Sequence, residues 1–308
     1  MTAVGLRRST RPPCVPRDDR PAPRPCGAGL DRWHGRGRCH AVVAAALALV
    51  ALLAPWATAA DTDVPFVVTP DRVTLAMLEL AGVGPDDHVI DLGSGDGRIV
   101  ILAAQRFGAT GLGVEIVDDL VRRSREHAMR AGVADRVEFR TEDLFDTDLS
   151  RATVVTMYLL PAVNLKLRPR LLALAPGTRV VSHDYDLGDW RPDRSVVVDA
   201  PDKPVGRDPR STLHLWTVPA RVAGSWCGGG AAAHRLRIDQ HHQDIDATLD
   251  ATPLTGRADG ARLRLRPDGD GTEWVLRWLA DGTLRVDAPT SLRGARFVRA
   301  AAGTCASR

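Results

Sequence analysis

Residues 89–98 constrain the fold of this chain more than any other stretch of its sequence. They read Val-Ile-Asp-Leu-Gly-Ser-Gly-Asp-Gly-Arg, an apolar run followed by three alternating glycines. The apolar run predicts a buried strand, and Gly93, Gly95 and Gly97 allow a turn that a ligand can approach closely. Residues 98–107 then have the apolar spacing of a helix. A strand, a glycine turn and a helix together place backbone N–H groups and a helix N-terminus beside a ligand.

The spacing of the glycines narrows the choice of ligand. The dinucleotide fingerprint G-x-G-x-x-G requires glycine at its sixth position, and Arg98 stands there instead. The pattern present is D-x-G-x-G-x-G, beginning at Asp91. It resembles motif I of the seven-stranded S-adenosylmethionine (SAM) methyltransferases. A glycine loop alone is a weak signal, so further contacts must come from the rest of the chain.

The length of 308 residues allows two modest domains with real cores. The net charge of +3 arises in residues 1–60, which hold nine arginines and three aspartates, so the remainder is slightly acidic. We therefore expect no nucleic-acid partner. We predict a basic leader at 1–60, a methyltransferase domain at 61–219 and a small all-β domain at 220–308.

The leader has the pattern of a targeting segment. An apolar run at 41–54 follows a basic stretch and is followed by Ala57-Thr58-Ala59-Ala60, which predicts a secretory signal cut after about Ala59 or Ala60. An uncleaved anchor, with membrane association through 41–60, is the alternative. A cleaved signal would place the protein outside the cytoplasm, and an uncleaved anchor would hold it at the membrane. Translation starting downstream of the apolar run would instead leave it cytoplasmic.

Strand and helix patterns alternate from residue 61 to residue 219. This alternation predicts an α/β fold, a Rossmann-like seven-stranded sheet with helices on both faces. We expect a first helix with Pro70 at its first position and Thr69 as its N-cap. The other expected strands lie at 110–116, 136–139, 153–157, 178–182, 195–198 and 212–218, and the other helices at 118–132 and 164–175.

After Pro219 the pattern becomes that of short alternating strands. Strands expected at 233–238, 245–249, 261–265, 274–279 and 283–286 predict a small antiparallel β domain, either a barrel or a sandwich, with Trp226, Trp274 and Trp278 in its core. Cys227 and Cys305 either form one disulfide or remain two unpaired thiols.

Three histidines of this region invite a metal interpretation. His241 and His242 are adjacent, and His234 precedes them by one strand length. Because neighbouring residues of a strand point to opposite faces, we expect no metal site here.

Polar residues follow successive strands of the predicted sheet. Asp91 and the glycines follow the first strand, Glu115 the second, Asp143 the third and 158–161 the fourth. Ligands of open α/β sheets bind at these strand ends. Glu115 suits the two hydroxyl groups of a ribose, and Asp143 suits an adenine amino group, because ionised acceptors make strong hydrogen bonds.

Residues from about 65 to about 193 resemble the seven-strand protein-lysine methyltransferases related to the mitochondrial enzymes that modify the ATP synthase c-subunit and the adenine nucleotide translocase. The similarity covers under half of the chain and does not account for the leader or the β domain. The matching segments are 65–70, 91–100, 113–115, 142–145, 158–161 and 180–190.

The resemblance implies SAM as the cofactor and a protein lysine ε-amine as the methyl acceptor. We expect Tyr158 and the backbone of Leu159 to orient the amine, and His183 and Asp184 to line the acceptor entrance. The expected cofactor-binding residues are Thr69, Asp91, Gly93, Ser94, Gly95, Gly97, Glu115, Asp143 and Leu144.

Two other functions remain open on the sequence alone. One is methylation of a small molecule. The other is an exported, non-catalytic binding or scaffold protein on a methyltransferase fold, which the leader motivates. The sequence specifies neither the oligomeric state nor a ligand of the β domain.

Overall fold

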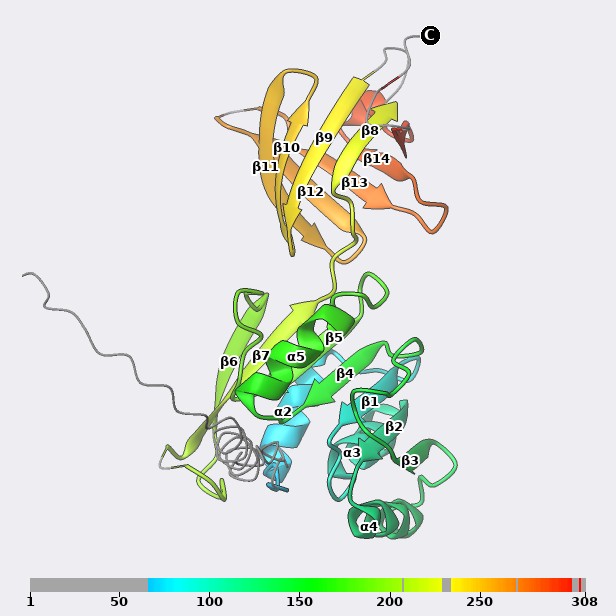
Figure 1. The fold of residues 1–308 in the computed structure, drawn as a ribbon, viewed down its shortest axis with the longest axis vertical. Helices are drawn as coiled ribbons and strands as arrows, with labels where there is room; N and C mark the ends of the chain where they lie inside the picture. Colours follow the sequence, from blue (N-terminus) through cyan, green and yellow to red (C-terminus); the bar gives the residue numbers. More distant parts are fainter. Residues whose placement is uncertain (1–65, 207, 229–233, 270, 301–304, 306–308) are drawn as a thin grey trace, which may run out of the picture. The chain divides into compact units, whose positions relative to one another are not determined.

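The computed structural model describes residues 66–206, 208–228, 234–269, 271–300 and 305. Residues 62–308 form one compact unit, which holds a seven-stranded sheet and a closed barrel (Figure 1). The predicted signal or anchor at 41–60 lies outside the described residues. Among the helices of the described ranges, none is long and apolar enough to span a membrane.

The sheet confirms the predicted fold class. Its strand order is β3-β2-β1-β4-β5-β7-β6, and β7 runs antiparallel to both β5 and β6. The strands are β1 (His88–Leu92), β2 (Thr110–Glu115), β3 (Val137–Thr141), β4 (Val154–Met157), β5 (Arg179–His183), β6 (Arg194–Asp199) and β7 (Arg210–Thr217).

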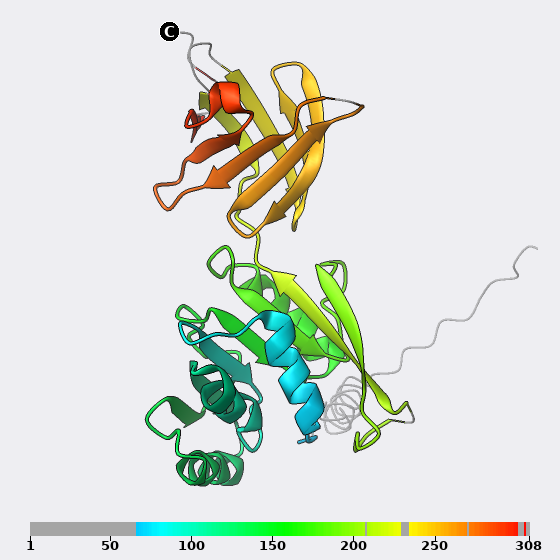
Figure 2. The ribbon, with the colours of Figure 1, turned by 180° about the vertical axis from the view of Figure 1, so that it is seen from behind.

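Helices cover both faces of the sheet, as expected. Val89 and Val154 pack with α2 and α3 on one face, while Ile90 and Val155 pack with α5 on the other. Views from opposite sides show α5 in front of the strands in one and α2 in front in the other (Figures 1 and 2). Burial on both faces explains why β1 and β4 are mostly apolar rather than alternating between apolar and polar residues. The helices are α2 (Asp71–Ala81), α3 (Arg98–Phe107), α4 (Asp118–Arg130) and α5 (Pro161–Leu171).

Two helix starts differ from the predictions. Pro70 rather than Thr69 precedes α2, and no side chain caps that helix. Thr69 instead lies buried with its hydroxyl 3.5 Å from His183 Nδ1, so its predicted capping role is wrong. The helix expected at 164–175 begins three residues earlier, because Pro161 occupies its first turn, where a missing N–H group costs nothing.

The remaining strands close into an eight-stranded antiparallel barrel, which decides between barrel and sandwich. Alternate side chains such as Leu236 and Ile238 point inward, and Trp226 is fully buried, while Trp274 and Trp278 pack half-buried at the margin. The strands are β8 (Gly224–Gly228), β9 (His234–His241), β10 (Asp244–Leu249), β11 (Thr252–Asp259), β12 (Arg262–Pro267), β13 (Trp274–Trp278), β14 (Leu284–Ala288) and β15 (Arg296–Arg299).

A disulfide links Cys227 of β8 to Cys305 beyond β15, with 5.5 Å between the two Cα atoms. Of the two states left open by the sequence, the structure has the bridged one. The domain boundary predicted between residues 219 and 220 lies between β7 and β8, and it remains a prediction.

Candidate functional site

The glycine loop, residues 93–97, joins the end of β1 to the start of α3. Gly93, Gly95 and Gly97 all have positive φ angles, between 54° and 80°. A Cβ atom on Gly95 would overlap the ring of Phe66, and one on Gly93 would lie 2.9 Å from Leu159 Cδ2. The loop therefore requires glycine both for its backbone conformation and for the two side chains packed against it.

Most N–H groups of this loop are already engaged. Gly93 and Ser94 donate to the carbonyl oxygen of Val114, at 3.0 and 2.8 Å, and Gly95 donates to Glu115 Oε2 at 3.0 Å. The Ser94 hydroxyl lies beneath the loop against Gly113. The sequence led us to expect free donors here, and the structure corrects that expectation. A loop with few free donors beside several acids suits a cationic ligand better than a phosphate.

Glu115 ends β2 and holds the loop in place. Its Oε1 accepts hydrogen bonds from the backbone N–H groups of Ile116 and Val117, at 2.9 and 3.1 Å, while Oε2 accepts the bond from Gly95. These bonds fix the carboxylate at the strand end. Ile116 beside it is 63% exposed, so a flat apolar group could cover it. The sequence analysis missed Ile116, although an apolar residue directly after a strand-end acid is a usable signal.

Asp91 lies in β1 below the loop and is 2% exposed. Its Oδ1 accepts a hydrogen bond of 2.7 Å from Thr156 Oγ1 in β4. Burial raises the pKa of Asp91 to about 7, against the lowering effect of Thr156, and the negative charges of Glu115 and Asp96 raise it further. Asp91 therefore supports the loop from beneath and exists in both protonation states near neutral pH.

Asp143 follows β3 and is exposed, with its Oδ1 accepting from Phe145 N at 2.8 Å. Neighbouring Glu142 donates its N–H group to the carbonyl oxygen of Glu115 at 3.1 Å, so the exits of β3 and β2 run together. Leu144 is half-buried. We call these adjacent groups at the ends of β1, β2 and β3 the strand-end site: Asp91, the glycine loop, Glu115, Asp143 and Leu144.

The predicted acceptor entrance also assembles. The rings of Tyr158 and His183 lie with centroids 3.9 Å apart, and Tyr185 stacks on Tyr158 at 6.5 Å. His183 is fully buried, with Nε2 2.8 Å from Ser211 Oγ. Burial lowers the pKa of His183 to about 4, so this ring is neutral. Burial and then the charge of Asp184 raise the pKa of Tyr158 to about 12, so its hydroxyl keeps its proton.

Asp184 carries the charge of this entrance. It has a left-handed φ of 65°, and its Oδ1 accepts from Thr212 N at 3.0 Å. Its Oδ2 lies 2.6 Å from Lys203 Nζ, which also donates to the carbonyl oxygen of Arg210 at 2.9 Å. The Lys203 side chain is only 11% exposed. The sequence analysis missed this pair, although Lys203 is one of just two lysines in the chain.

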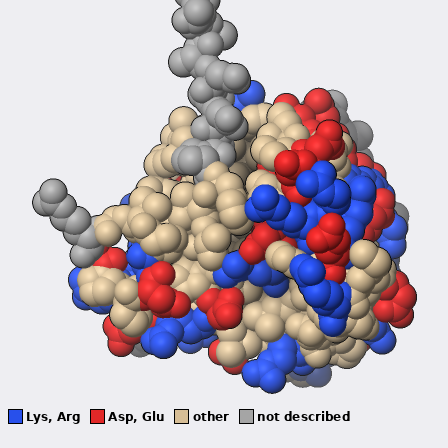
Figure 3. Space-filling view, turned by 90° about the horizontal axis from the view of Figure 1, so that it is seen from below, with Lys and Arg blue, Asp and Glu red and all other residues tan. Residues whose placement is uncertain are grey.

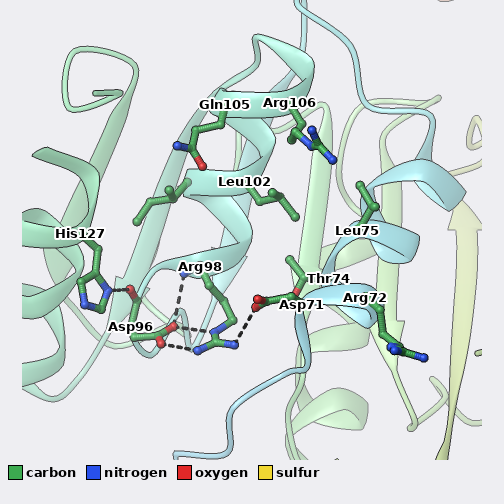
Figure 4. Close-up of a pocket in the computed structure, with 11 residues that line it drawn as sticks. Asp71, Arg72, Thr74, Leu75, Asp96, Arg98, Leu102, Gln105, Arg106 and His127 are labelled. Carbon is green, nitrogen blue, oxygen red and sulfur yellow. Dashed lines mark hydrogen bonds and ion pairs between the residues drawn. The ribbon is translucent and has the colours of Figure 1, made fainter. Parts of the chain in front are cut away.

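A separate groove of about 490 Å³ lies between α2 and α3 (Figure 4). Arg98 crosses its floor, ion-paired to Asp96 at 2.7 Å and to Asp71 at 3.2 Å. Arg98 also donates to the carbonyl oxygen of Thr69 at 2.8 Å. Neither Glu115 nor Asp143 lines the groove. Its ion pairs tie α2 to the glycine loop, and Asp96 is the residue that it shares with the strand-end site.

The surface charges give no sign of a nucleic-acid interface on the face seen in Figure 3. Lysine and arginine side chains there are interspersed with aspartates and glutamates. A nucleic-acid surface would gather basic groups into one patch or stripe.

Comparisons with known proteins place this site in a family context. Residues 91–194 match the ANTKMT methyltransferase domain family. A protein-lysine N-methyltransferase from Saccharolobus islandicus is 46% identical over 138 residues, which are 44% of this chain and 86% of that protein. The mouse adenine nucleotide translocase lysine N-methyltransferase is 37% identical over 131 residues, 42% of this chain and 57% of that enzyme.

A solved structure is also similar. It is described as an RNA methyltransferase from Salinibacter ruber in complex with S-adenosyl-L-homocysteine, and it is 54% identical. It covers 51% of this chain and 96% of its own, with a TM-score of 0.47.

Proposed function

The chain belongs to the family of SAM-dependent protein-lysine N-methyltransferases, and from that premise we propose that it methylates the ε-amine of a lysine in a protein substrate. The ion pair of Lys203 with Asp184, beside Tyr158, carries the proposal. This pair supports the proposal, because it places a lysine ammonium group on a carboxylate beside the aromatic rings of Tyr158 and His183.

SAM is the cofactor, and the strand-end site fits it. When bound, SAM supplies an electrophilic methyl group on a positively charged sulfur. Glu115 would accept from the ribose hydroxyls, Asp143 from the adenine amino group, and Ile116 would cover the adenine face. The engaged donors of the glycine loop and the surrounding acids suit this cation. Hydrogen bonds to a charged acceptor contribute about 1.5–3 kcal/mol each.

The acceptor amine must be neutral to react. A free lysine has a pKa of about 10.4, so presenting the neutral amine at pH 7 costs about 4.6 kcal/mol. Asp184 would bind the arriving ammonium group, and burial beside a positive sulfur would then favour loss of its proton to solvent. The Tyr158 hydroxyl and the Leu159 carbonyl oxygen would accept hydrogen bonds from the amine and aim its lone pair. Orientation of this kind can supply about 7–11 kcal/mol.

The bond changes are those of an in-line displacement. The nitrogen–carbon bond would form as the sulfur–carbon bond breaks, and S-adenosylhomocysteine would leave with the electron pair of the broken bond. The methylated nitrogen would carry the positive charge until it loses a proton to solvent. Because the bound ammonium group would lose its proton to solvent before the methyl transfer, no strong general base is required. Neutral His183 therefore has a positioning role, between Thr69 and Ser211.

A labelling experiment tests this proposal. The full chain is incubated with SAM that carries a deuterated methyl group, in three separate reactions. The first contains a lysine-rich protein extract, the second the same extract with acetylated lysines, and the third purified RNA. We expect label on lysine side chains in the first sample alone, and none with the Glu115→Ala variant. Label in RNA, in acetylated protein or in small molecules would contradict lysine methylation and indicate another methyl acceptor. SAM binding without any methyl transfer would favour the non-catalytic scaffold alternative.

We further propose that the protein works outside the reducing cytoplasm, exported or held at the membrane by residues 41–60. The Cys227–Cys305 disulfide supports this location, because such bonds persist in oxidising compartments. Fractionation of cells that produce the native protein tests it. Recovery of the chain in the cytosol with both thiols free would instead support a downstream translation start.

A further inference from the structure

Three side chains of metal-ligand type gather away from the strand-end site. Asp189 belongs to the segment between β5 and β6, while His241 ends β9 and His242 lies in the turn before β10. Their ligand atoms all lie within 4.8 Å of one another. We call this group the Asp-His-His cluster.

The distances within the cluster suit one small cation. Asp189 Oδ2 lies 3.6 Å from His241 Nε2 and 3.5 Å from His242 Nε2. Ligands held about 2.0–2.1 Å from a tetrahedral zinc ion lie roughly 3.3–3.4 Å apart. The two oxygen–nitrogen distances are therefore close to the spacing of a tetrahedral site, and they are too long for good direct hydrogen bonds.

The surrounding structure holds these ligands in position. Arg168 Nη1 pairs with Asp189 Oδ1 and donates to the carbonyl oxygen of Leu187 at 2.9 Å, which leaves Oδ2 facing the two histidines. Such an outer partner typically orients a ligating carboxylate. His242 has a left-handed φ of 54°, and its ring lies 4.4 Å from that of His241. We expected these two adjacent histidines to point to opposite faces of a strand. That expectation is wrong, because β9 ends at His241 and His242 lies in the turn.

His242 provides a second, independent observation. Its Nε2 is buried and has no hydrogen-bond partner among the described residues. The ring also packs 6.1 Å from the fully buried Trp190. A buried polar atom without a partner calls for an explanation, and a bound cation would supply one.

We propose that Asp189, His241 and His242 bind a Zn²⁺ ion through one oxygen and two nitrogens. Imidazole and carboxylate are ligands that zinc accepts, and the exposure of Asp189 and His241, 57% and 71%, leaves a fourth position open to water. The ion would fasten the barrel to the segment that begins at the acceptor entrance, five residues after Asp184. The proposal does not depend on the methyl acceptor.

Zinc titration of the intact protein tests the site. The full chain is prepared without a histidine tag, freed of metal by dialysis against a chelator, and titrated with Zn²⁺ by calorimetry and with Co²⁺ by visible absorption. We expect one equivalent of zinc and the absorption bands of tetrahedral cobalt. His241→Ala and Asp189→Asn should each weaken that equivalent at least tenfold, and His241 is exposed enough for its removal to leave the fold intact.

His234→Ala is the matched control. His234 Nδ1 lies 2.8 Å from Asp250 Oδ2 in the same barrel, and among the described residues no third side chain of metal-ligand type gathers with this pair. Zinc affinity should be unchanged in this variant. Absence of a bound equivalent in the wild type, or equal affinity in wild type, His241→Ala and Asp189→Asn, would overturn the proposal and leave the cluster as an ion pair.

Discussion

The carboxyl group of Asp91 and the hydroxyl group of Thr156 form a buried hydrogen bond of 2.7 Å that joins β1 to β4 below the glycine loop. The pKa of Asp91 is raised to about 7, well above its value in an unfolded chain. The folded protein therefore binds more protons than the unfolded one between about pH 4 and pH 7. This contribution to stability is complete below pH 4 and is lost as the pH rises to 7.

Asp91→Asn removes this dependence. We expect the free energy of unfolding of the wild type, relative to the variant, to fall by up to about 1.4 kcal/mol per pH unit over that range. Urea unfolding at pH 5, 6, 7 and 8 measures it. Glu126→Gln, an exposed change on α4, is the control and should show no such trend. A constant difference between wild type and Asp91→Asn would contradict the assignment.

Glu115→Ala should weaken SAM binding about 10- to 100-fold, because one or two charge-assisted hydrogen bonds to the ribose are lost. Calorimetry with SAM and with S-adenosylhomocysteine measures the effect, which should be similar for both. Glu126→Ala is the matched control. Equal SAM affinity in the Glu115→Ala and Glu126→Ala variants would show that Glu115 does not bind SAM.

Gly95→Ala should destabilise the protein more than Gly132→Ala. Both positions have positive φ, but only Gly95 has a ring, that of Phe66, where the new methyl group would lie. Gly132→Ala should therefore cost about 1–2 kcal/mol for the backbone alone. The difference is measured by thermal unfolding.

The double variant Phe66→Ala/Gly95→Ala separates the two causes. Removing the ring should restore part of the stability lost in Gly95→Ala. If Gly95→Ala and Gly132→Ala unfold alike, the contact with Phe66 is not close in solution.

Lys203→Met should lower the KM for a lysine-containing acceptor severalfold, because Lys203 occupies the carboxylate that the substrate lysine needs. Asp184→Asn should raise it. Steady-state kinetics with poly-L-lysine as the acceptor measures both. Lys166→Met, which removes the other lysine of the chain, should leave KM unchanged. A higher KM in Lys203→Met would show that Lys203 supports the entrance rather than competing for it.

Reduction of the Cys227–Cys305 bridge should destabilise the barrel by about 2–4 kcal/mol, because the bond closes a long stretch of chain. Urea unfolding with and without a reductant measures the loss. The Cys227→Ser/Cys305→Ser variant should not respond to the reductant.

The sequence was most informative where burial leaves few choices. The helix predicted at 98–107 and the strand end at Met157 were confirmed, because apolar periodicity and glycines mark them locally. The strand predicted at 110–116 ends one residue earlier, at Glu115. The position of Asp143 after β3 was confirmed for the same reason. The ligand roles of these residues remain predictions.

Features set by distant partners could not be read from local sequence. The sequence analysis predicted no strand at β11, because Pro253 and Gly256 have low strand propensity. Pairing of β11 with β12 overrides that propensity. Lys203 meets Asp184 only because β7 returns the chain beside β5. His241 and His242 share one side because of a turn that alternation cannot foresee.

The reversed direction of β7 has a consequence for the architecture. Thr217, near its end, pairs with Arg179, the first residue of β5, so the polypeptide departs from the edge of the sheet opposite Glu115 and the glycine loop. A module appended after β7 therefore begins at the opposite ends of the strands from Glu115 and the glycine loop. The C-terminal barrel should therefore be exchangeable at this junction. Grafting a different module after β7 should leave SAM affinity unchanged.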